Sequence, residues 1–253
     1  MIILLSPAKS LNFDPVDVPR SQPRFKNDTF QLAKILKKKS SADLMEMMKI
    51  SQKLADLNHD RFQQFSLSHT KENAKQAVFA FKGDVYQGLE ADKLTEKQLA
   101  FAQDHVRILS GLYGLLRPFD VIQPYRLEMG SKVKTAKGKS LYDFWGDALT
   151  DKINEDLKSV KSKVVVNLAS EEYFKSINKK KLDAELYTPN FKEYRDGKLK
   201  FISFSAKKAR GYMTQYIVRN KITNPEKLKG FNLENYAFDD EHSNPPYDLI
   251  FTR

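Results

Sequence analysis

Basic residues gather at residues 198–219, where a helix is expected to begin. This segment holds six lysines and arginines and no acidic residue. Lys207, Lys208 and Arg210 fall in the first turns of a helix that Ser205 is expected to cap. Cations there oppose the helix dipole and cost on the order of 0.3–1 kcal/mol each. Because free amides and cations together bind phosphate, the pattern predicts an anion site; the alternative is a cationic face paired with acidic residues elsewhere.

A second basic stretch covers residues 121–142, with five basic residues against one acidic residue. Arg126 and Glu128 are spaced to form a fixed pair on one strand face. Tyr125 and Tyr142 are interleaved with the cations and are candidates for stacking on nucleic-acid bases. The alternative interpretation is a solvated, lysine-rich loop.

Polar clusters follow two expected strands. The apolar run at residues 2–5 predicts a buried strand, and the loop after it carries Lys9. A second buried strand is expected at 164–166, with Glu171 shortly after it. Sites in open α/β sheets lie at such strand ends. Glu171, and Asp84 in another polar cluster, are therefore weak candidates for acid–base residues, because helix capping by itself accounts fully for the cluster around Glu171.

The residues that several kinds of chemistry require are missing from this sequence. The chain has no cysteine, which excludes disulfides, thiolate metal sites and a cysteine nucleophile. Its four histidines have no metal-binding spacing, and we expect neither a metal site nor a cofactor. Walker A, dinucleotide-binding and G-x-S-x-G motifs are also missing. Direct iron binding by carboxylates alone is a weaker alternative.

Composition favours a polyanionic partner. The 253 residues include 43 basic and 32 acidic side chains, a formal charge of +11. This excess suits nucleic acid, although general solubility charge is the alternative. The first apolar run is too short for a signal peptide, and no segment is long and apolar enough to cross a membrane. We expect a cytoplasmic protein, with a monomer favoured and the oligomeric state open.

The pattern of elements predicts a mixed α/β fold in one domain, residues 1–253. A further strand is expected at 247–251, and Asp196-Gly197 predicts the turn of a hairpin over 191–204. Helices are expected from Ser40 and Ser140, and another over 95–109, where Thr95 and Gln98 make a capping box. The helix that Ser205 caps is expected to end near Asn220.

Several long strings resemble the YaaA family, and together they span residues 5–211. They are Leu5-Ser6-Pro7-Ala8-Lys9, Phe81-Lys82-Gly83-Asp84-Val85-Tyr86-Gln87-Gly88-Leu89, Ile108-Leu109-Ser110-Gly111-Leu112-Tyr113-Gly114-Leu115-Leu116-Arg117-Pro118, Gln123-Pro124-Tyr125-Arg126-Leu127-Glu128-Met129-Gly130, Tyr142-Asp143-Phe144-Trp145-Gly146-Asp147, Asn167-Leu168-Ala169-Ser170-Glu171-Glu172-Tyr173-Phe174 and Phe204-Ser205-Ala206-Lys207-Lys208-Ala209-Arg210-Gly211. Strings of this length make chance agreement implausible.

The resemblance implies a role in the response to hydrogen peroxide that limits damage from free intracellular iron. It also implies an α/β fold with a positively charged cleft and a helix-hairpin-helix element that binds duplex DNA. The preferred position for this element joins a helix near 81–87 to the helix from Thr95, through residues 88–92. The alternative uses residues 110–114. Such a hairpin holds phosphates through backbone amides and reads no sequence.

The basic segments and the family resemblance together predict a protein that binds double-stranded DNA along its backbone. The alternative is an enzyme that acts on a nucleotide or nucleic acid in the same cleft, with Asp84 or Glu171 near the chemistry. The residues expected to contact phosphate are Lys9, Lys82, Arg117, Arg126, Lys132, Lys207, Lys208 and Arg210.

Overall fold

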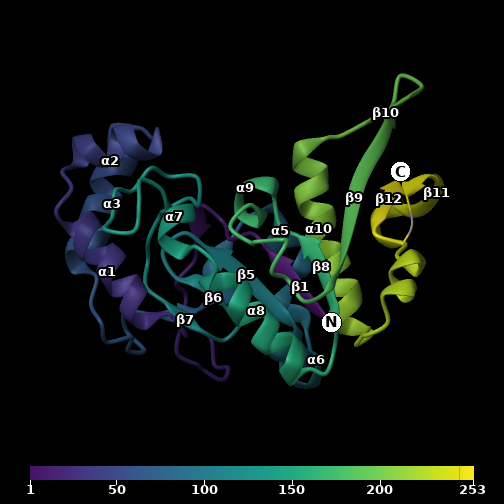
Figure 1. The fold of residues 1–253 in the computed structure, drawn as a ribbon, viewed down its shortest axis with the longest axis horizontal. Helices are drawn as coiled ribbons and strands as arrows, with labels where there is room; N and C mark the ends of the chain where they lie inside the picture. Colours follow the sequence, from purple (N-terminus) through teal and green to yellow (C-terminus); the bar gives the residue numbers. More distant parts are fainter. Residues whose placement is uncertain (245) are drawn as a thin grey trace.

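The protein is built on one large mixed sheet (Figure 1). The computed structural model describes residues 1–244 and 246–253. The strands run in the order β11-β12-β9-β8-β1-β5-β6, and β10 pairs with β9. They are β1 (Ile2–Leu5), β5 (Val106–Ser110), β6 (Gly114–Leu116), β8 (Val164–Leu168), β9 (Glu185–Arg195), β10 (Lys198–Lys200), β11 (Ala237–Asn244) and β12 (Asp248–Thr252). The expected α/β class and the strands expected at 2–5, 164–166 and 247–251 are confirmed.

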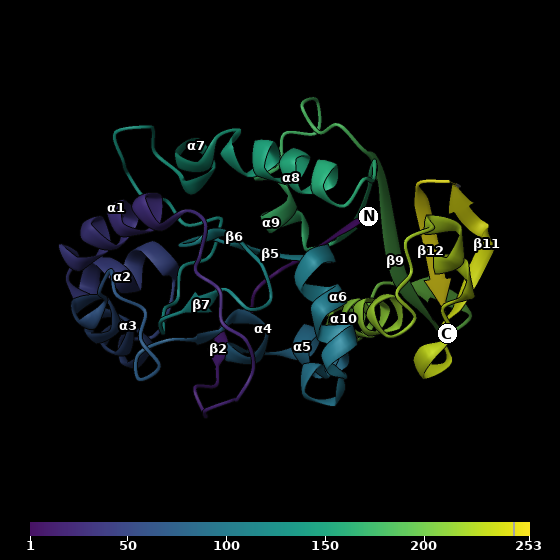
Figure 2. The same ribbon diagram turned by 90° about the horizontal axis from the view of Figure 1, so that it is seen from below.

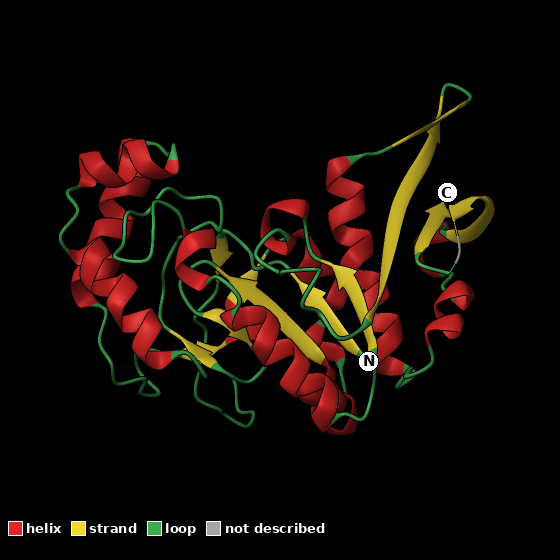
Figure 3. Ribbon diagram, viewed as in Figure 1, coloured by secondary structure: helices red, strands yellow, loops and turns green. Residues whose placement is uncertain are grey.

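Smaller elements surround this sheet (Figure 3). Two short ladders pair β2 (Ser10–Leu11) with β4 (Phe81–Lys82) and β3 (Lys75–Gln76) with β7 (Val121–Ile122). The α-helices are α1 (Lys26–Lys37), α2 (Ser41–Met48), α3 (Gln52–Gln64), α4 (Ala77–Ala80), α5 (Asp84–Leu89), α6 (Glu96–His105), α7 (Leu141–Trp145), α8 (Ala148–Ser159), α9 (Glu171–Phe174) and α10 (Ser203–Arg219). Three 3₁₀ turns are η1 (Ala91–Lys93), η2 (Pro225–Gly230) and η3 (Leu233–Asn235).

The centre of the sheet is parallel and covered on both faces. β1 pairs in parallel with both β5 and β8, and β8 pairs in parallel with β9. Figure 2 shows α7 and α8 on one side of these strands and α6 and α10 on the other. Every residue of β1 is buried, as expected for a strand covered on both faces. The parallel arrangement brings the carboxyl ends of β1 and β8 to the same edge.

The helix expected over 95–109 is wrong in its last four residues, 106–109. Thr95 does cap α6 with Gln98, but the helix ends at His105, and Val106 already has extended backbone. Residues 106–110 form β5, a fully buried strand beside β1. An apolar run with β-branched residues fits a buried strand as well as a helix stripe, and pairing with β1 decides between them.

Other helix boundaries also differ from expectation. The helix expected from Ser40 is two helices, α2 and α3, separated at Lys49, whose φ is 53°. The helix expected from Ser140 is interrupted at Gly146, whose φ of 49° divides α7 from α8. Ser205 is not the cap of α10, because that helix begins at Ser203. Lys207 therefore lies beyond the first turn of α10, and free terminal amides do not surround it.

The β9–β10 hairpin confirms the Asp196-Gly197 turn. Both residues have positive φ, 54° and 68°, as a type I′ turn requires. Near the base of the hairpin, Glu193 is buried and accepts hydrogen bonds from Arg195 at 2.7 Å and Arg253 at 2.8 Å. Burial opposes ionisation, but hydrogen bonds from Ser205 and the two arginines lower the pKa of Glu193 to about 2. This carboxylate ties the hairpin to the C-terminus.

Glu193→Gln is expected to lower the free energy of unfolding at pH 7 by about 1.5–3 kcal/mol, because charged hydrogen bonds are lost. Since the folded pKa is depressed, the contribution of the carboxylate is complete above pH 4.5 and disappears as pH falls toward 2. Urea unfolding of both proteins at several pH values checks this. A difference between wild type and variant that stays constant down to pH 2 would contradict it.

Candidate functional site

A pocket of about 430 Å³ lies where the carboxyl ends of β1 and β8 meet. Its walls come from the loop after β1, the start of α5, the segment around α9 and one face of α10. The lining residues are Ser6, Pro7, Ala8, Lys9, Ser10, Lys82, Gly83, Asp84, Val85, Tyr86, Glu128, Ser170, Glu172, Tyr173, Lys207 and Arg210. The volume is that of a small-molecule or nucleotide-sized site.

Hydrogen bonds hold the two strand ends together at the floor of the pocket. The Ser170 backbone N–H donates to Ser6 Oγ at 2.9 Å. The hydroxyl of Tyr86 donates to the carbonyl oxygen of Ser6 at 3.0 Å, and burial raises the pKa of Tyr86. The phenol therefore stays neutral and remains a donor. These contacts fix the loop that carries Lys9.

Four of the predicted phosphate-binding residues meet in this pocket: Lys9, Lys82, Lys207 and Arg210. They come from the loop after β1, from β4 and from α10, which are far apart in the sequence. One of them already has an acidic partner, since Lys9 Nζ lies 3.1 Å from Glu128. The pocket therefore brings four cations together from three segments of the chain, with the carboxylates of Asp84, Glu128 and Glu172 also in its lining.

Arg210 is the most enclosed of these cations. Its side chain is half-buried, and burial lowers the pKa of its guanidinium. Within the part of the chain that the structure describes, no carboxylate forms an ion pair with it. A guanidinium that is withdrawn from water without a counter-charge favours an anionic ligand, and its planar fork matches phosphate.

The two candidate acid–base residues are placed differently. Asp84 lies at the start of α5 and lines the pocket, half-buried. Glu171 is exposed and is not part of the lining, whereas its neighbour Glu172 is. Glu172 Oε1 accepts a hydrogen bond from the Gly130 backbone N–H at 2.9 Å. The loop that the sequence singled out therefore reaches the pocket through Glu172 and not through Glu171.

Two glycines position the pocket walls by letting α5 and α10 touch. A Cβ on Gly88 would lie 3.0 Å from the Tyr212 nitrogen, and one on Gly211 would lie 2.9 Å from the Gly88 Cα. The contact at Gly211 is shorter than real Cβ contacts, and the one at Gly88 is tighter than most of them. This approach brings the start of α5, with Asp84, against the face of α10 that carries Arg210.

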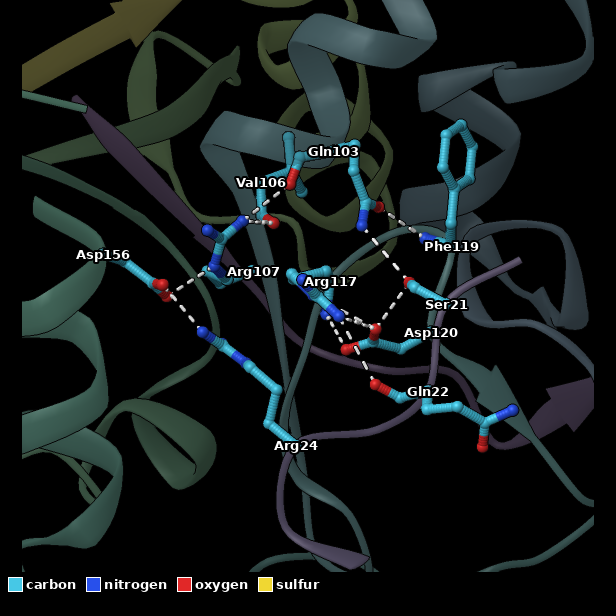
Figure 4. A network of polar contacts seen from close by, with 10 residues as sticks. All are labelled: Ser21, Gln22, Arg24, Gln103, Val106, Arg107, Arg117, Phe119, Asp120 and Asp156. Carbon is cyan, nitrogen blue, oxygen red and sulfur yellow. Dashed lines mark hydrogen bonds and ion pairs between the residues drawn. The ribbon is translucent and has the colours of Figure 1, made fainter. Parts of the chain in front are cut away.

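Arg117 lies outside the pocket, in the network of polar contacts drawn in Figure 4. Its Nη2 lies 2.8 Å from Oδ1 of the fully buried Asp120, and its backbone N–H donates to the same carboxylate. Ser21 Oγ also donates to Asp120, at 2.7 Å. Satisfying a buried carboxylate is a structural role, and it leaves Arg117 no part in the pocket.

The other predicted cations lie at or beyond the rim. Arg126 pairs with Glu128 at 2.8 Å, as the sequence predicts, although on a loop and not on a strand. Lys132 lines a neighbouring pocket that shares Glu128 and Glu172. Lys208 lies 5.4 Å from the centre of the Tyr212 ring and does not line the pocket.

Stacking by Tyr125 is contradicted. The side chain is buried, 4% exposed, and its hydroxyl lies 2.6 Å from Ser110 Oγ. Tyr142 is half-buried, and its hydroxyl donates to the carbonyl oxygen of Glu172. The tyrosines of the 121–142 stretch therefore support the loop, and nucleic acid has no access to Tyr125.

The two candidate hairpins differ in the structure. α5, η1 and α6 follow one another as helix, turn and helix, in the preferred position. The Glu90 N–H already donates to a carbonyl of α5, those of Lys93 and Leu94 donate to carbonyls within the turn, and Gly88 packs on α10. Phosphate binding there stays a prediction. The alternative at 110–114 is wrong, because it connects β5 to the antiparallel β6.

Ser6, Ser170 and Glu172 line the pocket, although none of them was among the predicted site residues. The signal for the serines was present, because each lies just beyond the end of a buried strand. Glu172 could not be distinguished from Glu171, since the direction of each side chain depends on how α9 packs.

Residues 1–244 and 246–253 contain neither a metal-binding cluster nor a membrane-spanning helix. No cluster of three or more histidine and acidic side chains there is arranged to hold a metal ion. No helix in the same ranges has the length and apolar character needed to cross a bilayer.

Comparison with known proteins gives the family. A curated relative from Saccharophagus degradans, described as a UPF0246 protein, is 52% identical over 255 residues, which cover 100% of this chain and 99% of the relative. The family model described as peroxide stress protein YaaA matches residues 1–242. A match over almost the entire chain, together with a full-length relative, places this chain in the YaaA family of peroxide stress proteins.

Proposed function

We propose that this chain binds double-stranded DNA by its phosphate backbone, without reading sequence, and that the strand-end pocket holds one phosphate. The observation that carries this proposal is Arg210, a half-buried guanidinium without an acidic partner among the described residues, beside Lys82 and Lys207. Phosphate satisfies such a guanidinium through two parallel hydrogen bonds. The formal charge of +11 favours the same partner at longer range.

Membership in a family of peroxide stress proteins indicates the conditions under which DNA binding would be useful to the cell. We propose that the protein acts in the cytoplasm as a monomer and limits the damage that free intracellular iron causes to DNA during peroxide stress. The helix–turn–helix segment of α5, η1 and α6 is the candidate for a second backbone contact.

The test is a titration of labelled duplex DNA against wild type and Lys207→Ala/Arg210→Ala at several salt concentrations. We expect wild-type affinity to fall steeply with salt, and the variant to bind at least tenfold more weakly, with a salt slope lower by about one. Each lost phosphate contact releases about one fewer counterion, which sets this value.

The matched control is Lys53→Ala/Lys158→Ala, which removes the same charge from two exposed positions outside the pocket. It should change affinity far less. Equal losses in both variants would mean that net charge alone drives binding, and the pocket would have no special role. Binding that is insensitive to salt would contradict the proposal as a whole.

A second function is favoured by one observation: Asp84 and Glu172 lie in the same pocket as the cations. A nucleotide-sized pocket with carboxylates beside a phosphate site suits an enzyme acting on a nucleotide or nucleic acid. Turnover that is lost in Asp84→Asn, with folding intact, would support this function. Undiminished turnover in that variant would exclude a catalytic role for Asp84.

A further inference from the structure

Three large aromatic side chains are exposed near the junction of β9, β10 and α10. Tyr194 is 52% exposed, Phe201 59% and Phe204 60%. They lie within eleven residues of one another in the sequence and at one end of β9. Single apolar residues scattered over a protein surface are common and need no explanation. A local group of exposed aromatic side chains, in contrast, marks an interaction site.

The hairpin that carries Tyr194 projects from the body of the protein (Figure 1). Tyr194 pairs across the ladder with Leu199, so their side chains share one face of the hairpin. The base is anchored, because the buried Glu193 binds both Arg195 and Arg253. The hairpin therefore presents its aromatic residue from a fixed base.

The surroundings of these aromatics are basic. Residues 191–208 contain six lysines and arginines and two acidic residues. Both acidic residues are already paired, Glu193 with Arg195 and Asp196 with Lys200 at 2.9 Å. Aromatic side chains interleaved with unpaired positive charge form the surface that stacks on bases and follows a single-stranded backbone.

The aromatic group is continuous with the pocket. Phe204, Lys207 and Arg210 follow one another at three-residue spacing on α10, which places them on one side of the helix. The six residue steps from Phe204 to Arg210 span roughly 9 Å along the helix axis. Lys207 and Arg210 line the pocket, so Phe204 lies one turn beyond its basic wall.

We infer that this surface, which we call the aromatic arm (Tyr194, Phe201 and Phe204), binds unpaired nucleic-acid bases. A strand whose phosphate lies against Arg210 and Lys207 stacks its neighbouring bases on Phe204 and Phe201. The inference rests on the proposed function and deepens it, because it makes single-stranded or locally unpaired DNA a ligand of the same site. A continuous duplex has no free base to offer and uses the cations alone.

The test compares a single-stranded oligonucleotide carrying 2-aminopurine with a duplex of equal length. The proteins are wild type, Phe201→Ala/Phe204→Ala, and Tyr247→Ala, an aromatic of similar exposure near the opposite end of β9. Wild type should quench the 2-aminopurine fluorescence by altering its stacking. The double variant should bind the single strand about tenfold more weakly per aromatic removed, with duplex affinity within about twofold of wild type.

The outcomes separate the two proposals. Wild type that binds neither DNA contradicts the proposed function. Wild type that binds duplex but not the single strand, or a double variant that loses both equally or neither, overturns the aromatic arm alone. Binding of wild type, but not of the double variant, to phosphatidylglycerol vesicles, with single-strand affinity unchanged by the substitutions, would also overturn it and assign the aromatics to a lipid surface. Circular dichroism confirms that the variants fold.

Discussion

Asp156→Asn is expected to lower the free energy of unfolding by about 3–5 kcal/mol, because it leaves two enclosed arginines without their counter-charge. Asp156 Oδ2 accepts from Arg107 Nε at 2.6 Å, and its Oδ1 accepts from Arg24 Nη1 at 2.7 Å (Figure 4). Arg107 is 4% exposed. The carboxylate joins the N-terminal segment, the central strand β5 and helix α8.

No other contact among the described residues would replace the hydrogen bond from Arg24 to Asp156 if that bond were lost. Arg24 Nε and Nη2 are buried without hydrogen-bond partners within the described ranges, so the contact with Asp156 is the main compensation for this charge. Burial raises the pKa of Asp156, but hydrogen bonds from Arg107 and Arg24 outweigh it and hold the pKa below 3.8. The stabilisation is therefore complete above pH 3.8 and is lost as pH falls through the lower folded value.

Denaturant unfolding at pH 7 measures this effect, and Asp183→Asn is the control. Asp183 pairs with Lys163 at 3.2 Å, but both side chains are more than half exposed. Surface pairs of this kind contribute about 0–1 kcal/mol, so the control should unfold close to wild type. Equal losses in the two variants would contradict a special role for the buried pairs.

Gly211→Ala is expected to destabilise the protein by about 1–3 kcal/mol and to weaken DNA binding as well. The added Cβ would overlap the carbonyl oxygen of Val85 and lie 2.8 Å from the Leu89 nitrogen. These are backbone atoms of α5, so the helices must separate. In a solvated helix the same change is stabilising by up to about 1 kcal/mol, and the expected sign is therefore opposite to helix propensity.

The control is Ser203→Ala, at an exposed position at the start of the same helix, which should leave unfolding within about 0.5 kcal/mol of wild type. Thermal unfolding and the duplex titration are measured on both proteins. A Gly211→Ala protein that is more stable than wild type would show that α5 and α10 are not held at this distance. Loss of stability without loss of affinity for duplex DNA would show that DNA binding does not depend on the contact between α5 and α10.

Features of this fold that depend only on neighbouring residues could be predicted from the sequence. Apolar runs predicted β1 and β8, since a strand covered on both faces needs no polar alternation. Asp196-Gly197 predicted its turn, because few other pairs accept positive φ at both positions. The capping box of Thr95 predicted where α6 begins. Chain length and composition were typical of a globular protein, the net charge favoured a polyanionic partner, and long motifs indicated the family.

Tertiary structure decided what depends on contacts between distant segments. Residues 106–110 became a strand because β1 lies beside them, although their spacing also fits a helix. The pocket required the parallel pairing of β1 with β8 and the close approach of Gly88 to Gly211, and neither is visible in local sequence. Arg117 and Arg210 look alike in the sequence. Packing pairs Arg117 with the buried Asp120. It places Arg210 in the wall of the pocket, where its guanidinium has no acidic partner among the described residues.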